Sequence, residues 1–571
     1  MQGYYIKKLG EHRGSPRVWL EGSQAVRAGF LPGQRYDIEV QGQAVVLQAN
    51  KDGSRVVSGK VIGEKNNPII DINSKALLAI FDGMASIRVV VKKDEIYLLP
   101  LASEIKKRER FVRVREKLEN GDPLTIGSLS HGGGILSHAI HSGLAQSGVD
   151  SRLTFANEIR GELLEHASIH NDAWSESTQV LSAPMQELAF DERGVASIPK
   201  VEILEMGLPC SGASKAGKSK RGLIHPEAHP HVGHLVVAAL VIVSKSNPAI
   251  VVLENVPEYS KSASADILRN QLRDMGYNTH ERVLNGKEWG ALENRNRWCM
   301  LAVTAGIDFD FDQLQPPVVR EQKLGDVLEQ LPVDDPRWSR MQGLKDKEVR
   351  DLADGKGFKM QVFGPDAQSI GTITKGYSKV RSTDPKIKHP TDPDLLRQLT
   401  PVEHARLKEI PSQLIEGLSN TLAHEVLGQS IVYPPFKGVG SHIGEALIKL
   451  IQKPAMPNFN IKDRVVVTDV RTQAVALNSR PATAVIVPAS SPQQGFDFSG
   501  SCVGEGVFVG LVLAVSDNGV VTQKVNRSGD TVQHAQQSLS RPVSVGSVVD
   551  IVYSNGVGLV GGLDVEPGMG R

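Results

Sequence analysis

A cysteine that follows directly after a short apolar strand constrains the fold of this chain more than any other feature. Residues 202–206 have the composition of a buried strand, and Gly207 and Pro209 end it just before Cys210. Open α/β sheets keep their reactive groups at the carboxyl ends of their strands. The pattern therefore predicts a cysteine at the edge of such a sheet.

Two further strand ends carry charged groups that could act together with Cys210. One apolar run leads directly into Glu254, and a later segment places Arg295 and Arg297 two residues apart, so that both would face one way on a strand. Taken singly, such a cysteine is most often a small core residue, such a carboxylate a helix cap, and such arginines a solvated strand face. Their joint occurrence at strand ends favours a catalytic set of nucleophile, acid and cations.

These motifs resemble those of the DNA cytosine-5 methyltransferases over about 124–450. The matching stretches, in the family's order, are Pro209-Cys210 (the nucleophile motif), 254–256 (Glu-Asn-Val), 293–297 (Glu-x-Arg-x-Arg for Gln-x-Arg-x-Arg), 397–407 (the Arg-x-Leu-Thr-x-x-Glu element) and 428–432 (the final Gly-Asn-x-Val). Any one of them is a weak signal, whereas five in order are a strong one.

The resemblance implies a role for each matched residue. The thiolate of Cys210 would attack C6 of a cytosine flipped out of the duplex, which raises electron density at C5 for methyl transfer. Glu254 would stabilise protonation at N3, Arg295 would hold the base at O2, and Arg297 would support the loop or a phosphate. Asn255 would orient the loop of the nucleophile without touching the substrate.

A glycine-rich turn follows the first strand of the same region and indicates a cofactor site. Glycines at 132–134, just before a helix that is predicted to begin at Ile135, let a ligand approach the backbone and the helix N-terminus. Glu158, at the end of the next strand and about 20 residues further on, is placed to accept hydrogen bonds from ribose hydroxyls. NAD would use the same geometry, but Gly-x-Gly-x-x-Gly is absent, which disfavours it. In the family this site holds S-adenosylmethionine, and the expected contacts are Leu129, Ser130, Gly132, Gly133, Gly134, Glu158, Leu208, Gln429 and Ser430.

The cofactor site departs from the family's pattern at two places. In Phe-x-Gly-x-Gly-Gly, Leu129 stands for the phenylalanine and His131 for the first glycine. The acid that contacts adenine should lie near 180–184, where the sequence has no aspartate. We therefore expect unusual cofactor affinity or adenine contacts.

The segment after the nucleophile is cationic and rich in glycine and serine. With Pro209 and Ser211, its lysines Lys215 and Lys218 are the predicted substrate loop, which would close over DNA by neutralising phosphates. Four histidines between 225 and 234 suggest a metal, but prolines interrupt their register and no Cys or Asp accompanies them. We therefore expect no metal site.

Composition fits an intracellular enzyme. The net charge is +1, so binding of nucleic acid would have to use local basic patches. The three cysteines, Cys210, Cys299 and Cys502, are too far apart to suggest a disulfide framework or a zinc site, and a reducing cytoplasm fits them. The longest apolar run, 235–243, is far below the ~20 residues that span a bilayer. No membrane role is expected.

Residues 1–100 look like a duplicated β unit of strand, helical turn and hairpin. The first copy resembles the AbrB-type swapped-hairpin DNA-binding fold, notably at 29–35. The alternative, a small β domain that serves only for dimerisation, is about equally favoured. A homodimer through this domain is part of the prediction.

The predicted fold is α/β: a doubly wound, Rossmann-like S-adenosylmethionine-dependent methyltransferase core with a small target recognition region and β-rich domains at both ends. The predicted segments are 1–103 (the duplicated β domain), 104–122 (a charged, solvated linker helix), 123–307 (the catalytic core), 308–390 (the target recognition region), 391–452 (the end of the core, with a helix expected at 443–452), 453–460 (a linker) and 461–571 (a domain similar to the KfrB type found with plasmid maintenance proteins). Arg381, Lys386 and Lys388 are expected to contact phosphates.

The predicted activity is methylation of cytosine C5 in double-stranded DNA, of the restriction-modification kind. The KfrB resemblance suggests an origin in a mobile element. Two alternatives stay open: the same chemistry on RNA, and a DNA-binding regulator with an inactive core, which the unusual His131 would fit.

Overall fold

A computed structural model describes most of the first 452 residues and parts of the rest. The described residues are 1–209, 212–213, 225–318, 321–356, 359–452, 486–487, 507–516, 519–524, 531–545, 547–554 and 557–562. The chain divides into two compact units, Met1–Asn460 and Ile461–Arg571. Of the predicted segments, the linker at 453–460 lies outside the described residues.

The centre of the first unit is a seven-stranded sheet in the order β13-β12-β11-β14-β15-β17-β16. The first five strands of this order run parallel, and β17 is antiparallel to both of its neighbours. The prediction of a mostly parallel, doubly wound sheet is confirmed. The strands are β11 (Leu124–Leu129), β12 (Ser151–Asn157), β13 (Gln179–Leu181), β14 (Ile203–Gly207), β15 (Ile250–Asn255), β16 (Tyr277–Asn285) and β17 (Asn296–Thr304).

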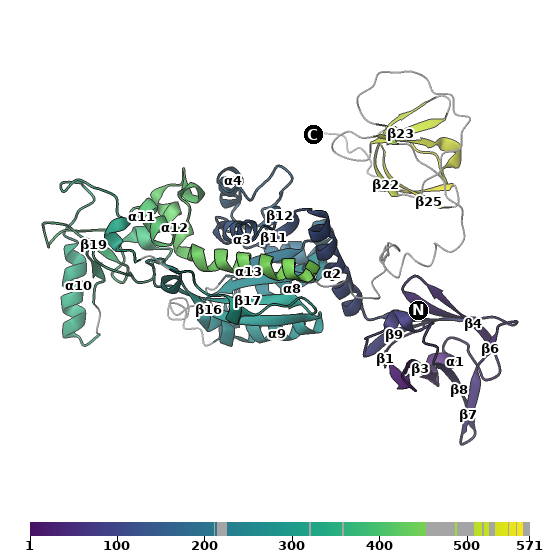
Figure 1. Cartoon of the computed structure of the whole chain (residues 1–571). Helices are drawn as coiled ribbons and strands as arrows, with labels where there is room; N and C mark the ends of the chain where they lie inside the picture. Colours follow the sequence, from purple (N-terminus) through teal and green to yellow (C-terminus); the bar gives the residue numbers. More distant parts are fainter. Residues whose placement is uncertain are drawn as a thin grey trace. The chain divides into compact units, whose positions relative to one another are not determined.

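Helices cover both faces of this sheet (Figure 1). On one face lie α3 (Ile135–Gln146) and α13 (Tyr433–Gln452), which share a core with Ile203 and Ile250. On the other lie α8 (Leu235–Ser246) and α9 (Ala263–Asp274), with the alternate strand residues Leu204 and Val251. Both faces are apolar because parallel strands are buried on both sides.

Glycines set the closest helix contact. The helix that was expected at 443–452 begins ten residues earlier, at Tyr433. Its Gly440 crosses α3 so closely that a Cβ there would lie 2.5 Å from the carbonyl oxygen of Ile140. Glycine normally weakens a helix, which is why the sequence placed the start too late; here it permits the packing.

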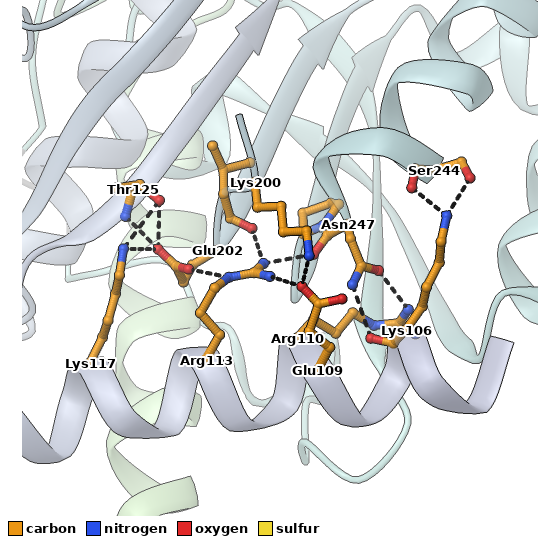
Figure 2. Close-up of polar contacts among 12 residues, drawn as sticks. Lys106, Glu109, Arg110, Arg113, Lys117, Thr125, Lys200, Glu202, Ser244 and Asn247 are labelled. Atoms are coloured by element: carbon orange, nitrogen blue, oxygen red, sulfur yellow. Dashed lines mark hydrogen bonds and ion pairs between the residues drawn. The ribbon is translucent and has the colours of Figure 1, made fainter. Parts of the chain in front are cut away.

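Helix α2 (Ala102–Asn120) is not the solvated linker that its charges predicted. Arg110 is buried and its Nε donates to Oγ1 of Thr304 over 2.8 Å. Nε of Arg113 and Nζ of Lys117 lie 2.7 and 2.5 Å from the two carboxylate oxygens of Glu202, which is fully buried (Figure 2). The basic residues therefore fasten α2 to the amino end of the central sheet, where β14 begins.

The two N-terminal repeats interleave. In the first repeat are β3 (Ser15–Glu21), β4 (Arg35–Gln41) and β5 (Ala44–Ala49); in the second are β8 (Lys65–Ile72), β9 (Ser86–Lys92) and β10 (Glu95–Pro100). Strand β3 pairs with β8 and β5 with β10, both antiparallel.

The register of these pairs is symmetric. Val46 lies opposite Tyr97, with the flanking pairs Val45–Leu98 and Leu47–Ile96, and Trp19 lies opposite Asp71. Equivalent positions of the two repeats thus meet about one pseudo-twofold axis. The pairing between the two repeats is made within a single chain.

The predicted target recognition region has little regular structure. It holds α10 (Gln342–Ala353), which has no buried residue, and the short strands β18 (Val362–Phe363) and β19 (Lys386–Lys388), which form a small sheet with β20 (Leu396–Arg397) beyond its predicted end. Lys386 does not face phosphates as expected: it is fully buried, and its Nζ donates to the carbonyl oxygens of Arg381 and Asp384. That prediction is wrong for Lys386.

The second unit contains an antiparallel sheet in the order β21-β24-β23-β22-β25-β26. Its strands are β21 (Ile486–Val487), β22 (Val507–Val515), β23 (Val520–Lys524), β24 (Thr531–Ala535), β25 (Val548–Ser554) and β26 (Val557–Gly562). The predicted β-rich character is confirmed. In the described parts of both units, no helix has the length and apolar content needed to cross a bilayer.

Candidate active site

Glu254 lies at the carboxyl end of β15, level with Gly207 on the neighbouring strand β14. A Cβ on Gly207 would be 3.7 Å from Oε2 of Glu254. The carboxylate therefore lies beside the end of β14, three residues before Cys210. Cys210 itself, with Ser211, Lys215 and Lys218, lies outside the described residues.

The two arginines of the third motif have different surroundings, because Arg295 precedes β17 and Arg297 is in it. Nε of Arg297 lies 2.6 Å from Oε1 of Glu254, and both side chains keep about an eighth of their surface exposed, 12% and 13%. Arg295 is buried, and its guanidinium donates to the carbonyl oxygens of Ile373 and Gly428 over 3.3 and 3.0 Å. The structure thus brings Arg297, and not Arg295, to the acid.

Asn255 holds the strand end before the nucleophile motif. It is buried, and its Nδ2 donates to the carbonyl oxygen of Leu208 over 3.0 Å. Pro209 follows as a half-buried residue. This contact joins β15 to the segment that leads to Cys210, as the resemblance implied.

The glycine-rich turn joins the end of β11 to α3. Ser130, Gly132 and Gly134 all have positive φ, of 52°, 56° and 75°, which is unusual for the serine. The amide of Gly132 donates to Oε2 of Glu158 over 2.9 Å. The turn is therefore held from the end of β12 by the carboxylate expected to bind ribose.

His131 points inward and not toward the expected cofactor. Its ring is buried, Nδ1 lies 2.7 Å from Oγ of Ser128, and Nε2 lies 3.3 Å from Nε1 of Trp174. Because indole can only donate, Nε2 accepts and Nδ1 carries the proton. Burial lowers the pKa of His131 to about 3, so the ring is neutral. The histidine that replaces the family's glycine thus fills a space beneath the turn.

Glu205 is a buried acid that sequence reasoning did not select. It lies on β14 opposite Ser128, 3.9 Å from Nδ1 of His131. Burial, together with the charge of Glu254, raises its pKa to about 8 against the opposing effect of the Ser128 and Ser137 hydroxyls. The carboxyl is therefore protonated near neutral pH. The neighbouring residues on the strand are apolar, and nothing in the local sequence shows that this acid is buried and not on a solvent-exposed strand face.

The remaining predicted cofactor residues differ in how far they are exposed at this edge of the sheet. Gly133 faces α12 (Asn420–Gln429), where a Cβ would lie 2.6 Å from a methyl carbon of Val426. Gln429 is exposed and Ser430 half-buried at the end of α12. Leu129 and Leu208 are buried, so only their main chains could face a ligand.

Two side chains near the predicted adenine position were missed. Ile159 follows Glu158 and leaves 66% of its surface exposed, which is unusual for an apolar residue at a strand end. Ser182 lies where the adenine-contacting acid was sought, and its Oγ would be 3.0 Å from a Cβ on Gly161. An apolar face and a hydroxyl could take a base in place of the absent aspartate.

A sequence model of the C-5 cytosine-specific DNA methylases matches residues 140–445, more than half of the chain. The chain belongs to this family. A KfrB domain model matches residues 507–561, which confirms the C-terminal resemblance. The AbrB-like character of residues 1–103 stays a prediction.

Curated relatives agree with this membership. The chain is 28% identical over 262 residues to the type II methyltransferase M.NlaX of Neisseria lactamica, covering 44% of this chain and 79% of that protein. It is 26% identical over 265 residues to M1.ScrFI of Lactococcus lactis subsp. cremoris, covering 44% and 64%. Among solved structures, the Dnmt2 methyltransferase of S. pombe aligns with 58% of this chain and 99% of its own, at 19% identity and a TM-score of 0.45.

The family's methyl donor is S-adenosylmethionine, and the residues present fit it. A turn with left-handed residues exposes main-chain groups, a carboxylate stands at the end of β12, and an apolar side chain follows it. Glu158, the Gly132–Gly134 turn and Ile159 are the groups that would hold its ribose, amino acid and adenine parts.

Proposed function

We propose that this protein transfers a methyl group from S-adenosylmethionine to C5 of cytosine in double-stranded DNA. The observation that carries the proposal is the 2.6 Å ion pair of Arg297 and Glu254 beside Gly207, at the same sheet edge as the Glu158-bound glycine turn. The end of β14, which leads to the nucleophile motif, therefore lies between the expected cofactor site at β11 and β12 and the acid and cation of β15 and β17.

In the proposed reaction, Sγ of Cys210 bonds to C6 of the flipped base, and the C5–C6 π electrons move toward C5 while N3 is protonated from the edge that Glu254 faces. S-adenosylmethionine would supply the methyl group, which C5 takes up as S-adenosylhomocysteine leaves with the electrons of the broken S–CH3 bond. A base then removes the C5 proton, the double bond re-forms and the C6–S bond breaks to return Cys210.

The geometry changes one role in this scheme. Arg297 forms an ion pair with Glu254, and both side chains are partly exposed. Arg295 instead donates hydrogen bonds to main-chain carbonyl oxygens. We therefore assign the contact with O2 of the base to Arg297, and a structural role to Arg295.

Further parts of the proposal rest on resemblance. The N-terminal repeats would bind DNA as an AbrB-like module, which their interleaved register supports. The protein would act in the cytoplasm, and its KfrB domain suggests carriage on a mobile element. Because the repeats pair within one chain, we propose that this domain folds without a second copy of the chain. Sedimentation would show whether the predicted homodimer forms.

Bisulfite sequencing of DNA from cells that express the chain tests the activity and reads the target sequence at once. Protection of cytosines at a fixed site, lost with Cys210→Ala, is the expected result. Assays of purified protein on duplex DNA and on tRNA, with labelled cofactor, separate the RNA alternative. Absence of saturable cofactor binding would favour the inactive regulator.

A further inference from the structure

A buried cluster of charged side chains joins two segments that lie far apart in the sequence. Its members are Glu293, Arg295 and Lys408, whose exposed fractions are 0%, 3% and 0%. Charged side chains are almost never buried so completely unless they are paired. The partners of these three show what the cluster holds.

Lys408 follows α11 (Pro401–Leu407) and points into the turn after α12. Its Nζ donates to the carbonyl oxygens of Leu427, Ser430 and Ile431, the last two over 3.2 and 3.4 Å. It also lies 3.4 Å from Oε2 of Glu293. Burial, together with the charges of Arg295 and Arg297, lowers the pKa of Lys408 to about 7 against the opposing effect of Glu293.

Glu293 and Arg295 connect this turn with the segment around Ile373, in the predicted target recognition region. Oε1 of Glu293 accepts the amide of Ile373 over 2.8 Å, and Arg295 donates to the carbonyl oxygens of Ile373 and Gly428. Gly428 is so close to this segment that a Cβ would lie 2.5 Å from the amide nitrogen of Lys375. The two segments are therefore in main-chain contact.

We propose that Lys408 is a positioning residue that fixes the turn 428–431 against the strand carrying Arg297. The inference rests on the proposed function, because this turn holds Gln429 and Ser430, two of the expected cofactor contacts. The amine of Lys408 donates hydrogen bonds to three carbonyl oxygens at this turn, and Glu293 places the opposite charge beside it.

Two roles of Lys408 can be separated. A buried ion pair contributes little net stability compared with an apolar pair, but removal of one partner leaves an uncompensated charge. Stability should therefore follow the net charge of the cluster, in which Arg295 also lies 3.6 Å from Glu293. Each single variant at 293 or 408 changes this net charge by one, and the double variant leaves it unchanged. Cofactor affinity should instead fall whenever the amine of Lys408 is removed, with either glutamate or glutamine at position 293.

The test compares Lys408→Met, Glu293→Gln and the double variant in the full-length protein. Thermal midpoints report stability, and titration with S-adenosylhomocysteine, without DNA, reports cofactor affinity. Lys408→Met is expected to lower the midpoint and weaken binding about tenfold, as expected for loss of charged hydrogen bonds. Glu293→Gln is expected to bind nearly as the unchanged protein does. The double variant is expected to regain the midpoint but not the affinity.

Glu202→Gln is the matched control, since Glu202 is equally buried and paired with cations but lies at the opposite end of the sheet. It should lower the midpoint and leave the affinity unchanged. A double variant that regains both properties, or Lys408→Met with unchanged affinity, overturns the inference. If Lys408→Met does not fold, the charge-balanced double variant still gives the answer. An unchanged protein without saturable binding contradicts the proposed function, and the inference with it.

Discussion

Nε of Arg297 lies 2.6 Å from Oε1 of Glu254, while Arg295, two residues earlier, is turned into the protein. The pair keeps about an eighth of its side-chain surface exposed at the sheet edge, where a substrate base could reach it, whereas Arg295 donates to the main chain of two other segments. The same motif therefore supplies one arginine to the site and one to the framework.

Arg297→Lys is expected to lower methyl transfer by about 10- to 100-fold, because lysine keeps the charge but loses the planar fork. Its thermal midpoint should stay close to that of the unchanged protein, since lysine keeps a positive charge beside Glu254. Turnover with labelled cofactor and differential scanning calorimetry measure both.

The matched variant two residues earlier should behave in the opposite way. Arg295→Lys removes a buried fork that satisfies two carbonyl oxygens, so the midpoint should fall by several degrees. If Arg295→Lys instead lost turnover at an unchanged midpoint, Arg295 would be the residue that meets the base.

Glu205 predicts a pH dependence of stability. Its pKa in the folded protein, about 8, is raised above the ordinary 4.5 by burial. Between these values the unfolded chain gives up the proton that the folded chain keeps, so stability falls as the pH rises, by at most about 1.4 kcal/mol per pH unit. Glu205→Gln removes this slope.

The difference in thermal midpoint between Glu205→Gln and the unchanged protein should therefore grow from pH 5 to pH 8. The facing groups His131 and Glu254 are present in both proteins, so their titration affects both alike. Equal slopes for the two proteins would show that Glu205 is ionised in the fold.

The docking of α2 predicts a stability effect far from the site. Burial alone would raise the pKa of Glu202, but hydrogen bonds from Lys117 and Thr125 together lower it. Glu202→Gln leaves Arg113 and Lys117 without their anion and should cost about 3 kcal/mol. Urea denaturation of the core measures this cost. A midpoint equal to that of the unchanged protein would mean that apolar packing alone holds α2.

The order of the catalytic strands was predictable because apolar runs and their polar ends leave a local pattern. The helix at Ile135 and the site of Glu254 followed from the same pattern. The earlier start of α13 did not, because Gly440 is unfavourable for a helix until α3 packs against it.

Paired charges were the least predictable part. The arginines of α2 have the spacing of a solvated helix, and only the buried Glu202 from 89 residues further along the chain explains Arg113. Lys408 has no local signal at all, since its partners lie in segments distant in sequence. Burial of charge is decided by tertiary pairing, which single-sequence patterns do not contain.

The register of the N-terminal repeats makes the last prediction. With β3 on β8 and β5 on β10, each repeat already has its partner, so this domain should not join two chains, and the full-length protein should sediment as a monomer. Removal of residues 1–54 takes away β3 and β5, so β8 and β10 each lose one of their two neighbouring strands. Two shortened chains could then pair with each other about the same axis, with Tyr97 opposite its counterpart, so the shortened protein should sediment as a dimer. A full-length dimer that is lost when residues 1–100 are removed would show instead that this domain does join chains.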